Sequence, residues 1–166
     1  RQNTETWPDQ PDTWTGLGNV LVSLEKFDEA IAAYSRTMEL FPDHVDALHG
    51  RAVANHRRAS TFGGVQYYRD ALDDYHQVAT LDPSHLHAHQ NMGLLFQLLD
   101  EHEKAIGAFR RVLQDDPRYL AAYSSMAYSL QHCCQWENLA ATIDRVVELT
   151  REEINSGDDI TASPFN

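Results

Sequence analysis

The chain has 166 residues, 42% of them hydrophobic, and carries 25 Asp and Glu against 13 Lys and Arg, a formal net charge of −12. This length allows one domain or a short array of repeats, and the apolar content is sufficient for a hydrophobic core. The acidic balance argues against nucleic acid and anionic membranes as partners, because both need a basic face, and no run of eighteen apolar residues is present that could span a bilayer.

Prolines recur along the chain at a nearly constant spacing. Pro8, Pro42, Pro83 and Pro117 are separated by 34, 41 and 34 residues. A period in this range is typical of arrays built from one helical or mixed supersecondary unit. Pro8 stands in the closing position of a unit whose body is missing, so we expect residues 1–10 to be the tail of a truncated upstream repeat.

Each of the last three prolines follows a predicted amphipathic helix with one internal pattern. A small alanine precedes the proline by twelve residues and an aromatic residue precedes it by eight, in the pairs Ala30 and Tyr34, Ala71 and Tyr75, and Ala105 and Phe109. A first helix comes before each of these and carries a small residue at Gly18, Ala52, Gly93 and, in a fourth unit, Ala127. The pattern resembles the tetratricopeptide repeat, a helix–turn–helix unit of about 34 residues. The resemblance implies an all-α fold, a right-handed solenoid of antiparallel helix pairs.

The pattern divides the chain into four units, 11–44, 45–85, 86–119 and 120–153, followed by a linker at 154–166. The second unit is seven residues too long, and we expect the surplus to form a loop around residues 60–64, because two adjacent glycines disfavour an unbroken helix. The fourth unit is degenerate and lacks the closing proline, as expected where an array ends or changes into another structure.

Two clusters invite a metal or catalytic interpretation, and neither has the right spacing. His85, His87 and His89 alternate, but on a predicted helix alternate residues lie about 200° apart and cannot share one ion. Cys133 and Cys134 are adjacent, whereas zinc ligands are separated by two to four residues, so we expect buried thiols at a junction between helix and turn. With no cysteine framework for a secreted protein, we expect a cytoplasmic or nucleocytoplasmic location.

No phosphate-binding loop, nucleophile elbow or metalloprotease helix is present, so the sequence predicts no catalytic residue, metal or cofactor in this chain. The functional surface should then be the groove lined by the first helices of the units. Polar and amide side chains there can both donate to and accept from an extended peptide backbone. The candidate groove residues are Thr15, Asn19, His49, His56, Gln90, Asn91, Leu94, Gln97, Ser124, Tyr128 and Gln131.

One peptide specificity is disfavoured. Tetratricopeptide domains that clamp the acidic tails of Hsp70 and Hsp90 present Lys, Asn and Arg in this groove, while the corresponding positions here include Thr15, Asn19, Asp46 and Gly50. A groove without those basic residues is a poor site for a pair of carboxylates.

The last unit resembles a more specific family. Ala122-Tyr123, Met126-Ala127, Leu130-Gln131, Cys134 and Trp136 follow the pattern A-Y-x-x-L-A-x-x-L-Q-x-x-C-x-W, in which Met126 replaces the first leucine. That pattern is found at the junction between repeats and catalytic region in protein O-GlcNAc transferases and SPINDLY-type relatives, and Ser163-Pro164-Phe165 is similar to a segment that follows it. The resemblance implies that a catalytic domain using a UDP- or GDP-sugar follows Asn166 and that these repeats select substrates. Of that family's asparagine ladder only Asn91 is retained, since Gly16, Gly50 and Ser125 occupy the other positions.

The junction also predicts local structure. We expect Trp136 to be buried and to anchor the last helix as Phe27 does in the first unit, and we expect residues 137–153 to form a helix. Its inward residues should be Leu139, Ile143, Val146, Val147 and Leu149.

The sequence thus predicts a protein- or peptide-binding module, with the repeats of a glycosyltransferase as the favoured parent. A non-enzymatic scaffold that assembles a protein complex is the alternative. Homo-oligomerisation through the repeats is compatible with both.

Overall fold

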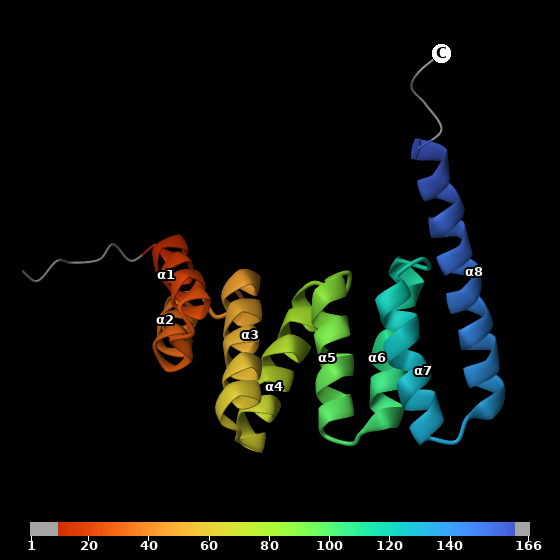
Figure 1. Cartoon of the computed structure of the whole chain (residues 1–166). Helices are drawn as coiled ribbons and strands as arrows, with labels where there is room; N and C mark the ends of the chain where they lie inside the picture. The colour runs from red at the N-terminus through yellow and green to blue at the C-terminus, as the bar shows by residue number, and fades with distance from the viewer. Residues whose placement is uncertain (1–9, 162–166) are drawn as a thin grey trace, which may run out of the picture. The chain divides into compact units, whose positions relative to one another are not determined.

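The computed structural model describes residues 10–161, with side chains described up to residue 155, and within this range it contains eight α-helices and no strand (Figure 1). The chain divides into two compact units, residues 1–88 and 89–166. The predicted repeat tail around Pro8 and the Ser163-Pro164-Phe165 segment lie outside the described residues. The helices are α1 (Pro11–Ser23), α2 (Phe27–Leu40), α3 (Val45–Phe62), α4 (Val65–Leu81), α5 (Leu86–Leu98), α6 (His102–Asp115), α7 (Leu120–His132) and α8 (Trp136–Thr161).

The prolines end the second helices as the sequence predicts. Pro42, Pro83 and Pro117 each follow a residue that has left the helical region, with φ between −137° and −129° and ψ between 83° and 90°. Proline disfavours the helical conformation in the residue before it, which fixes these ends.

Two histidines, His44 and His85, cap the N-terminal ends of α3 and α5. The Nδ1 atoms of His44 and His85 accept hydrogen bonds from the backbone N–H groups of Ala47 and Ala88, at 3.2 and 3.1 Å. A side chain that accepts from the first turn satisfies a backbone donor with no partner inside the helix. His85 of the alternating histidine trio is therefore a helix-capping residue.

The small residues of the repeat pattern allow close approach of helices. In the first unit the ring of Tyr34 lies where a Cβ at Gly18 or Gly50 would be, 2.6 and 2.5 Å from the nearest ring atoms. In the second unit the ring of Phe109 lies against Gly93 in the same way, at 2.6 Å. A larger residue at these glycines would displace the aromatic ring that fills the space between helices.

The surplus residues of the second predicted repeat, 45–85, extend its helices. The predicted loop at 60–64 is wrong for residues 60–62, which belong to α3; only Gly63 and Gly64 interrupt the helices, with φ of 82° and 108°. As a result α3 and α4 have 18 and 17 residues, against 13 and 14 in α1 and α2. The two glycines supply a left-handed turn that replaces the single positive-φ residue of the shorter turns, such as Glu25.

The last helix differs from its prediction. The predicted linker is wrong for residues 154–161, because α8 continues through Thr161; a single glycine such as Gly157 costs only about 1 kcal/mol in a helix interior. The burial predicted for Trp136, Ile143 and Val147 is also wrong, since these side chains are 60%, 48% and 41% exposed.

The inward face of α8 is narrower than predicted. Leu149 is buried, and Leu139 and Val146 are partly buried. Nothing within the described range covers the opposite face of α8. Cys133 is partly buried and Cys134 is exposed at a φ of 54°, so the predicted junction is correct but buried thiols are not found.

Candidate functional site

Of the two predicted groove residues on α1, one is buried and the other is exposed. Thr15 is buried, and its hydroxyl lies 3.2 Å from that of Thr37 on α2, so its assignment to a groove is wrong. It faces the partner helix of its own pair. Asn19, one turn further on, is exposed, and its Oδ1 accepts a hydrogen bond from the Tyr34 hydroxyl at 2.7 Å. Asn19 is therefore held in place with its amide N–H group available to a partner.

The two predicted residues of α3 are partly buried histidines. The ring of His49 lies 5.7 Å from that of Tyr75 and 4.9 Å from that of His85, and its buried Nε2 has no hydrogen-bond partner among the described residues. Burial, together with the nearby His85 and His87, lowers the pKa of His49 to about 4, while Asp46 opposes the shift. Burial also lowers the pKa of His56, so both side chains are neutral at pH 7.

In the second unit two glutamines connect α5 to the next first helix. The Oε1 of Gln90 accepts a hydrogen bond of 2.6 Å from the hydroxyl of Tyr119, the residue before α7. The Nε2 of Gln97 donates to the backbone oxygen of Ser125 at 2.6 Å and to the hydroxyl of Ser129 at 2.7 Å. These bonds leave the amide N–H groups of Gln90 and the carbonyl oxygen of Gln97 for a partner.

The remaining predicted residues of this unit vary in exposure. Asn91 and Leu94 on α5 are partly buried, while Ser124, Tyr128 and Gln131 on α7 are exposed. Tyr128 has 52% of its surface exposed and its ring centroid lies 4.2 Å from that of His132. We name Gln90, Leu94, Gln97, Ser124, Tyr128 and Gln131 the α5–α7 face.

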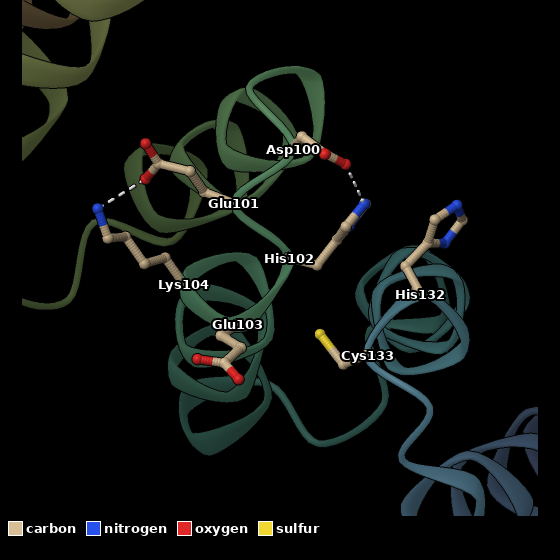
Figure 2. A pocket seen from close by; sticks show the side chains of 7 residues that line it. All are labelled: Asp100, Glu101, His102, Glu103, Lys104, His132 and Cys133. Atoms are coloured by element: carbon tan, nitrogen blue, oxygen red, sulfur yellow. Dashed lines mark ion pairs between the residues drawn. The ribbon is translucent and has the colours of Figure 1, made fainter.

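A pocket of about 500 Å³ lies beside the end of α7, where the turns before α6 and after α7 meet (Figure 2). The His102 side chain is only 10% exposed; its Nε2 lies 3.1 Å from Asp100, and its Nδ1 has no hydrogen-bond partner within the described range. Its ring stacks on that of His132 at 4.3 Å. Glu101, Glu103, Lys104 and Cys133 complete the lining.

The chemistry available in this pocket is limited. Burial and the negative charge of Glu103, with a contribution from Cys134, raise the pKa of the Cys133 thiol, which keeps it protonated and a weak nucleophile. Among the described residues no group of three or more His, Cys, Asp or Glu is placed to hold a metal ion. The pocket therefore extends the polar surface next to Tyr128 without forming a catalytic constellation.

Sequence reasoning missed one polar cluster in the first unit. The guanidinium of Arg51 on α3 donates from Nε and Nη2 to the two carboxylate oxygens of Asp74 on α4, at 2.9 and 2.7 Å. Asn55, also on α3, is 4% exposed and lines a pocket of about 300 Å³ beside this pair. An alignment of the repeats with one another would have identified these residues, because Arg51 and Asn55 stand where the third predicted repeat, 86–119, has the apolar residues Met92 and Phe96.

Models of one family match most of the helical region. Residues 11–44 and residues 56–119 match models described as tetratricopeptide repeat, and together these ranges make up more than half of the chain.

Two curated relatives share part of the sequence. The protein CTR9 homolog of Arabidopsis thaliana is 34% identical over 108 residues, which is 65% of this chain and 9% of the relative. Small glutamine-rich tetratricopeptide repeat-containing protein 2 of Mycosarcoma maydis is 26% identical over 100 residues, 60% of this chain and 26% of the relative. The chain thus spans a small part of the length of the curated proteins that it matches.

Solved structures share the fold at low sequence identity. A crystal structure of MamA matches with a TM-score of 0.80 at 18% identity, over 89% of this chain and 82% of the other. The first tetratricopeptide domain of Spaghetti (RPAP3), bound to the HSP90 peptide SRMEEVD, matches with a TM-score of 0.68 at 22% identity, over 80% of this chain and 99% of the other. In the part of the chain that the structure describes, no helix is long and apolar enough to cross a membrane.

Proposed function

The chain belongs to the tetratricopeptide repeat family, which confirms the predicted all-α repeat fold, and from this premise we propose that it is a protein- or peptide-binding module that uses the α5–α7 face. The observation that carries the proposal is the pair of oriented amides on α5. Gln90 has donors available and Gln97 has an acceptor available, and both side chains are held by hydrogen bonds to residues at or in α7.

The spacing of the two amides suits an extended peptide. Seven residues of helix separate Gln90 from Gln97, a rise of about 10 Å. An extended chain covers that distance in about three residues, so one backbone carbonyl and one backbone N–H of a bound strand can reach the two side chains. Because both amides are already held in place, less side-chain entropy is lost when a peptide binds.

Tyr128 supplies the apolar part of the face. It is half exposed and braced by His132, so it offers a rigid ring to a partner side chain. Exposed, well-supported tyrosines are enriched among the residues that dominate binding energies.

The ligand of one structural neighbour supports the general function. The Spaghetti domain is bound to a peptide, SRMEEVD, so a domain with this helical arrangement holds a short segment of another protein. We do not extend the acidic specificity to this chain, because of the residues at the corresponding positions only Asn19 fits the Lys, Asn and Arg pattern of such domains, and the basic residues are missing.

The proposal is tested by selecting peptides from a library of neutral extended sequences and measuring their affinity by isothermal titration calorimetry. We expect Tyr128→Ala and Gln90→Ala each to weaken binding by about fivefold or more, the effect of one lost hydrogen bond or aromatic contact. Gln114→Ala, an exposed amide on α6, is the matched control and should leave the affinity unchanged. Equal affinities for all four proteins would contradict the use of this face.

That the chain is part of a longer protein, and which one, stays a prediction. The resemblance of residues 122–136 to the repeat–catalytic junction of O-GlcNAc transferases rests on the sequence alone, and the family matches end at residue 119. A sugar-transfer assay with UDP- or GDP-sugars on the product of the intact gene separates a glycosyltransferase from the alternative, a non-enzymatic scaffold. The division into repeats at 11–44, 45–85, 86–119 and 120–153, homo-oligomerisation and a cytoplasmic location are likewise proposals.

A further inference from the structure

Three positions of the α3–α4 pair carry polar residues where other pairs carry apolar ones. On α3 these are Arg51 and Asn55; the corresponding residues are Leu17 and Leu21 in α1, Met92 and Phe96 in α5, and Met126 and Leu130 in α7. On α4 the position is Asp74, which corresponds to Ala33 of α2 and Ala108 of α6. Residues that break a pattern at one place in a regular fold are expected where a functional site is built.

Two of these residues satisfy each other. Arg51 makes the two-pronged contact with Asp74, and its Nη1 donates to the hydroxyl of Ser35 on α2 at 3.2 Å. The Asp74 side chain is 5% exposed and that of Arg51 26%. A buried pair of this kind seldom stabilises a protein more than apolar residues of the same volume would, so stability alone does not explain it.

The third residue is unsatisfied. The Asn55 side chain, 4% exposed, lines the pocket between α2, α3 and α4, and its amide forms no hydrogen bond with any described residue. Among the described residues the buried side-chain atoms without a partner are His49 Nε2 and His102 Nδ1, so the Asn55 amide is not sealed from solvent; it opens onto the pocket and is a candidate ligand for a molecule that enters it.

The pocket is negatively charged. Asp70, Asp73 and Asp74 line it against one guanidinium, that of Arg51. Asp70 accepts a hydrogen bond from Gln66, and no ion pair of Asp70 or Asp73 is found within the described range. The pKa of Asp74 is raised, first by burial and further by the neighbouring charges of Asp70 and Asp73, although Arg51 opposes the shift.

The walls suit an alkyl stem and a cationic head. Ile31 and the ring of Tyr67 provide apolar surface. The guanidinium of Arg58 lies over the ring of Tyr67, 3.7 Å from its centroid, so this ring already supports a cation on one face. A volume of about 300 Å³ is at the small end of the range for organic ligands and fits one side chain better than a large cofactor.

We propose that the pocket formed by Ile31, Arg51, Asn55, Tyr67, Asp70, Asp73 and Asp74 binds the ammonium or guanidinium end of an alkyl chain, with the Asn55 carbonyl and the carboxylates of Asp70 and Asp73 as acceptors. Such a group can come from a lysine or arginine of a partner protein or from a free polyamine. This site lies in the first unit and is independent of the proposed α5–α7 face in the second.

Nuclear magnetic resonance titration of the whole chain tests the site. The probes are n-butylammonium, spermidine and a short neutral peptide with one lysine, each added at constant ionic strength, and the signals are the Asn55 side-chain amide and the Arg51 Nε. We expect saturable shifts at both signals. The Asp70→Asn/Asp73→Asn double variant should weaken binding by about tenfold, since each removed charge contributes on the order of 0.7 kcal/mol at a partly exposed site.

Two further variants isolate the geometry. Asn55→Leu should weaken binding by about fivefold, and Asp43→Asn, an exposed acid elsewhere in the same unit, should leave it unchanged. Circular dichroism confirms that the variants are folded. If Asn55→Leu does not fold, the single variant Asp73→Asn, at an exposed position, replaces it in the titration.

The outcomes of the titration identify the source of the cation and show when the proposed site is wrong. Tighter binding of the lysine peptide identifies a protein side chain, and tighter binding of spermidine identifies a polyamine; both support the site. Absence of shifts at Asn55 overturns it. Shifts of equal size with magnesium ions, or an equal loss in Asp43→Asn, also overturn it, because they show a general attraction of cations to an acidic protein.

Discussion

The helix pairs α1–α2 and α3–α4 lie in the same unit and share one plan, yet their interiors differ. Between α1 and α2 the polar contacts include the hydroxyl pair of Thr15 and Thr37 and the hydrogen bond from Tyr34 to Asn19, and apolar residues such as Leu21 and Ala33 pack beside them. Between α3 and α4 stand a charged pair and an unpaired amide. The difference indicates that the repeat scaffold fixes the backbone with a few small and aromatic residues and leaves other interior positions available for chemistry.

The additional length of α3 provides a contact with the start of α2. Phe62, in the extension of α3, places its ring 6.3 Å from that of Phe27 at the start of α2, and the guanidinium of Arg57 lies 5.3 Å from the same ring. Phe27 is consequently 3% exposed. Trp136 occupies the equivalent first position of α8 and is exposed. A residue at this position is buried only if another helix covers it.

The largest expected effect separates these two aromatic residues. Phe27→Ala should lower the free energy of unfolding by about 3–5 kcal/mol, because it removes a fully packed ring. Trp136→Ala should lower it by about 1 kcal/mol or less, because most of the indole remains in water in the folded chain. Urea unfolding followed by circular dichroism measures both, and similar losses for the two variants would contradict the difference in burial.

The charged pair should be nearly as sensitive. Asp74→Ala leaves the Arg51 guanidinium without its partner, and we expect a loss of about 2–4 kcal/mol, somewhat less than for a fully buried pair because Arg51 is partly exposed. Asp73→Ala, the exposed neighbour, should change the free energy of unfolding by about 0.5 kcal/mol or less. Unfolding in urea at pH 7 compares the two, and a small effect of Asp74→Ala would show that the pair is already separated in solution.

The stability of the chain should depend on pH through His49 on α3, whereas the corresponding residue of α1, Thr15, does not titrate. The pKa of His49 falls from 6.5 to about 4 on folding, so below pH 6.5 the unfolded chain binds a proton that the folded chain excludes. The contribution of His49 to stability should therefore decrease as the pH is lowered from about 6.5 to 4, by about 1–2 kcal/mol because the ring is only partly buried, and this contribution should level off below pH 4.

The His49→Gln variant isolates this contribution. It should unfold with a shallower pH dependence than the parent chain between pH 6.5 and 4, and the two curves should run parallel above pH 7. The free energy of unfolding at several pH values measures both. Curves that are parallel over the whole range would assign the dependence to other histidines.

The smallest effect concerns two glycines of α1. Gly18→Ala should lower the free energy of unfolding by about 1–3 kcal/mol, because the new methyl group meets the ring of Tyr34. Gly16→Ala, with no atom within 4 Å of the new Cβ, should raise it by about 0.5–1 kcal/mol through its better helix propensity. Thermal unfolding of both variants checks the opposite signs, and a shift in the same direction for both would contradict the close packing at Gly18.

Sequence reasoning succeeded where a position is fixed by neighbours inside one helix pair. Gly18, Gly93, Tyr34 and Phe109 were identified as positions of the repeat pattern, and the structure places each ring against its glycine. Sequence reasoning failed where burial depends on another element: Trp136 has no covering helix within the described residues.

The candidate site was predicted in part. The positions of Gln90 and Gln97 on a first helix were found, but their hydrogen bonds to α7 depend on tertiary contacts that a single sequence does not show. Thr15 was assigned to the wrong face, because a helical period identifies a stripe and not the helix against which it packs. Arg51 and Asn55 were missed although an alignment of the repeats with one another would have revealed them.

The central claim is that the polar interior of α3–α4 is kept for binding and contributes little to folding. The free energy of unfolding of the Arg51→Met/Asp74→Ala double variant, which makes this interior resemble that of the other pairs, tests it most directly. We predict that the double variant is as stable as the parent chain or more stable by about 1–4 kcal/mol, although Asp74→Ala alone is destabilising. A double variant no more stable than Asp74→Ala would show that the pair is required for folding and would contradict the claim.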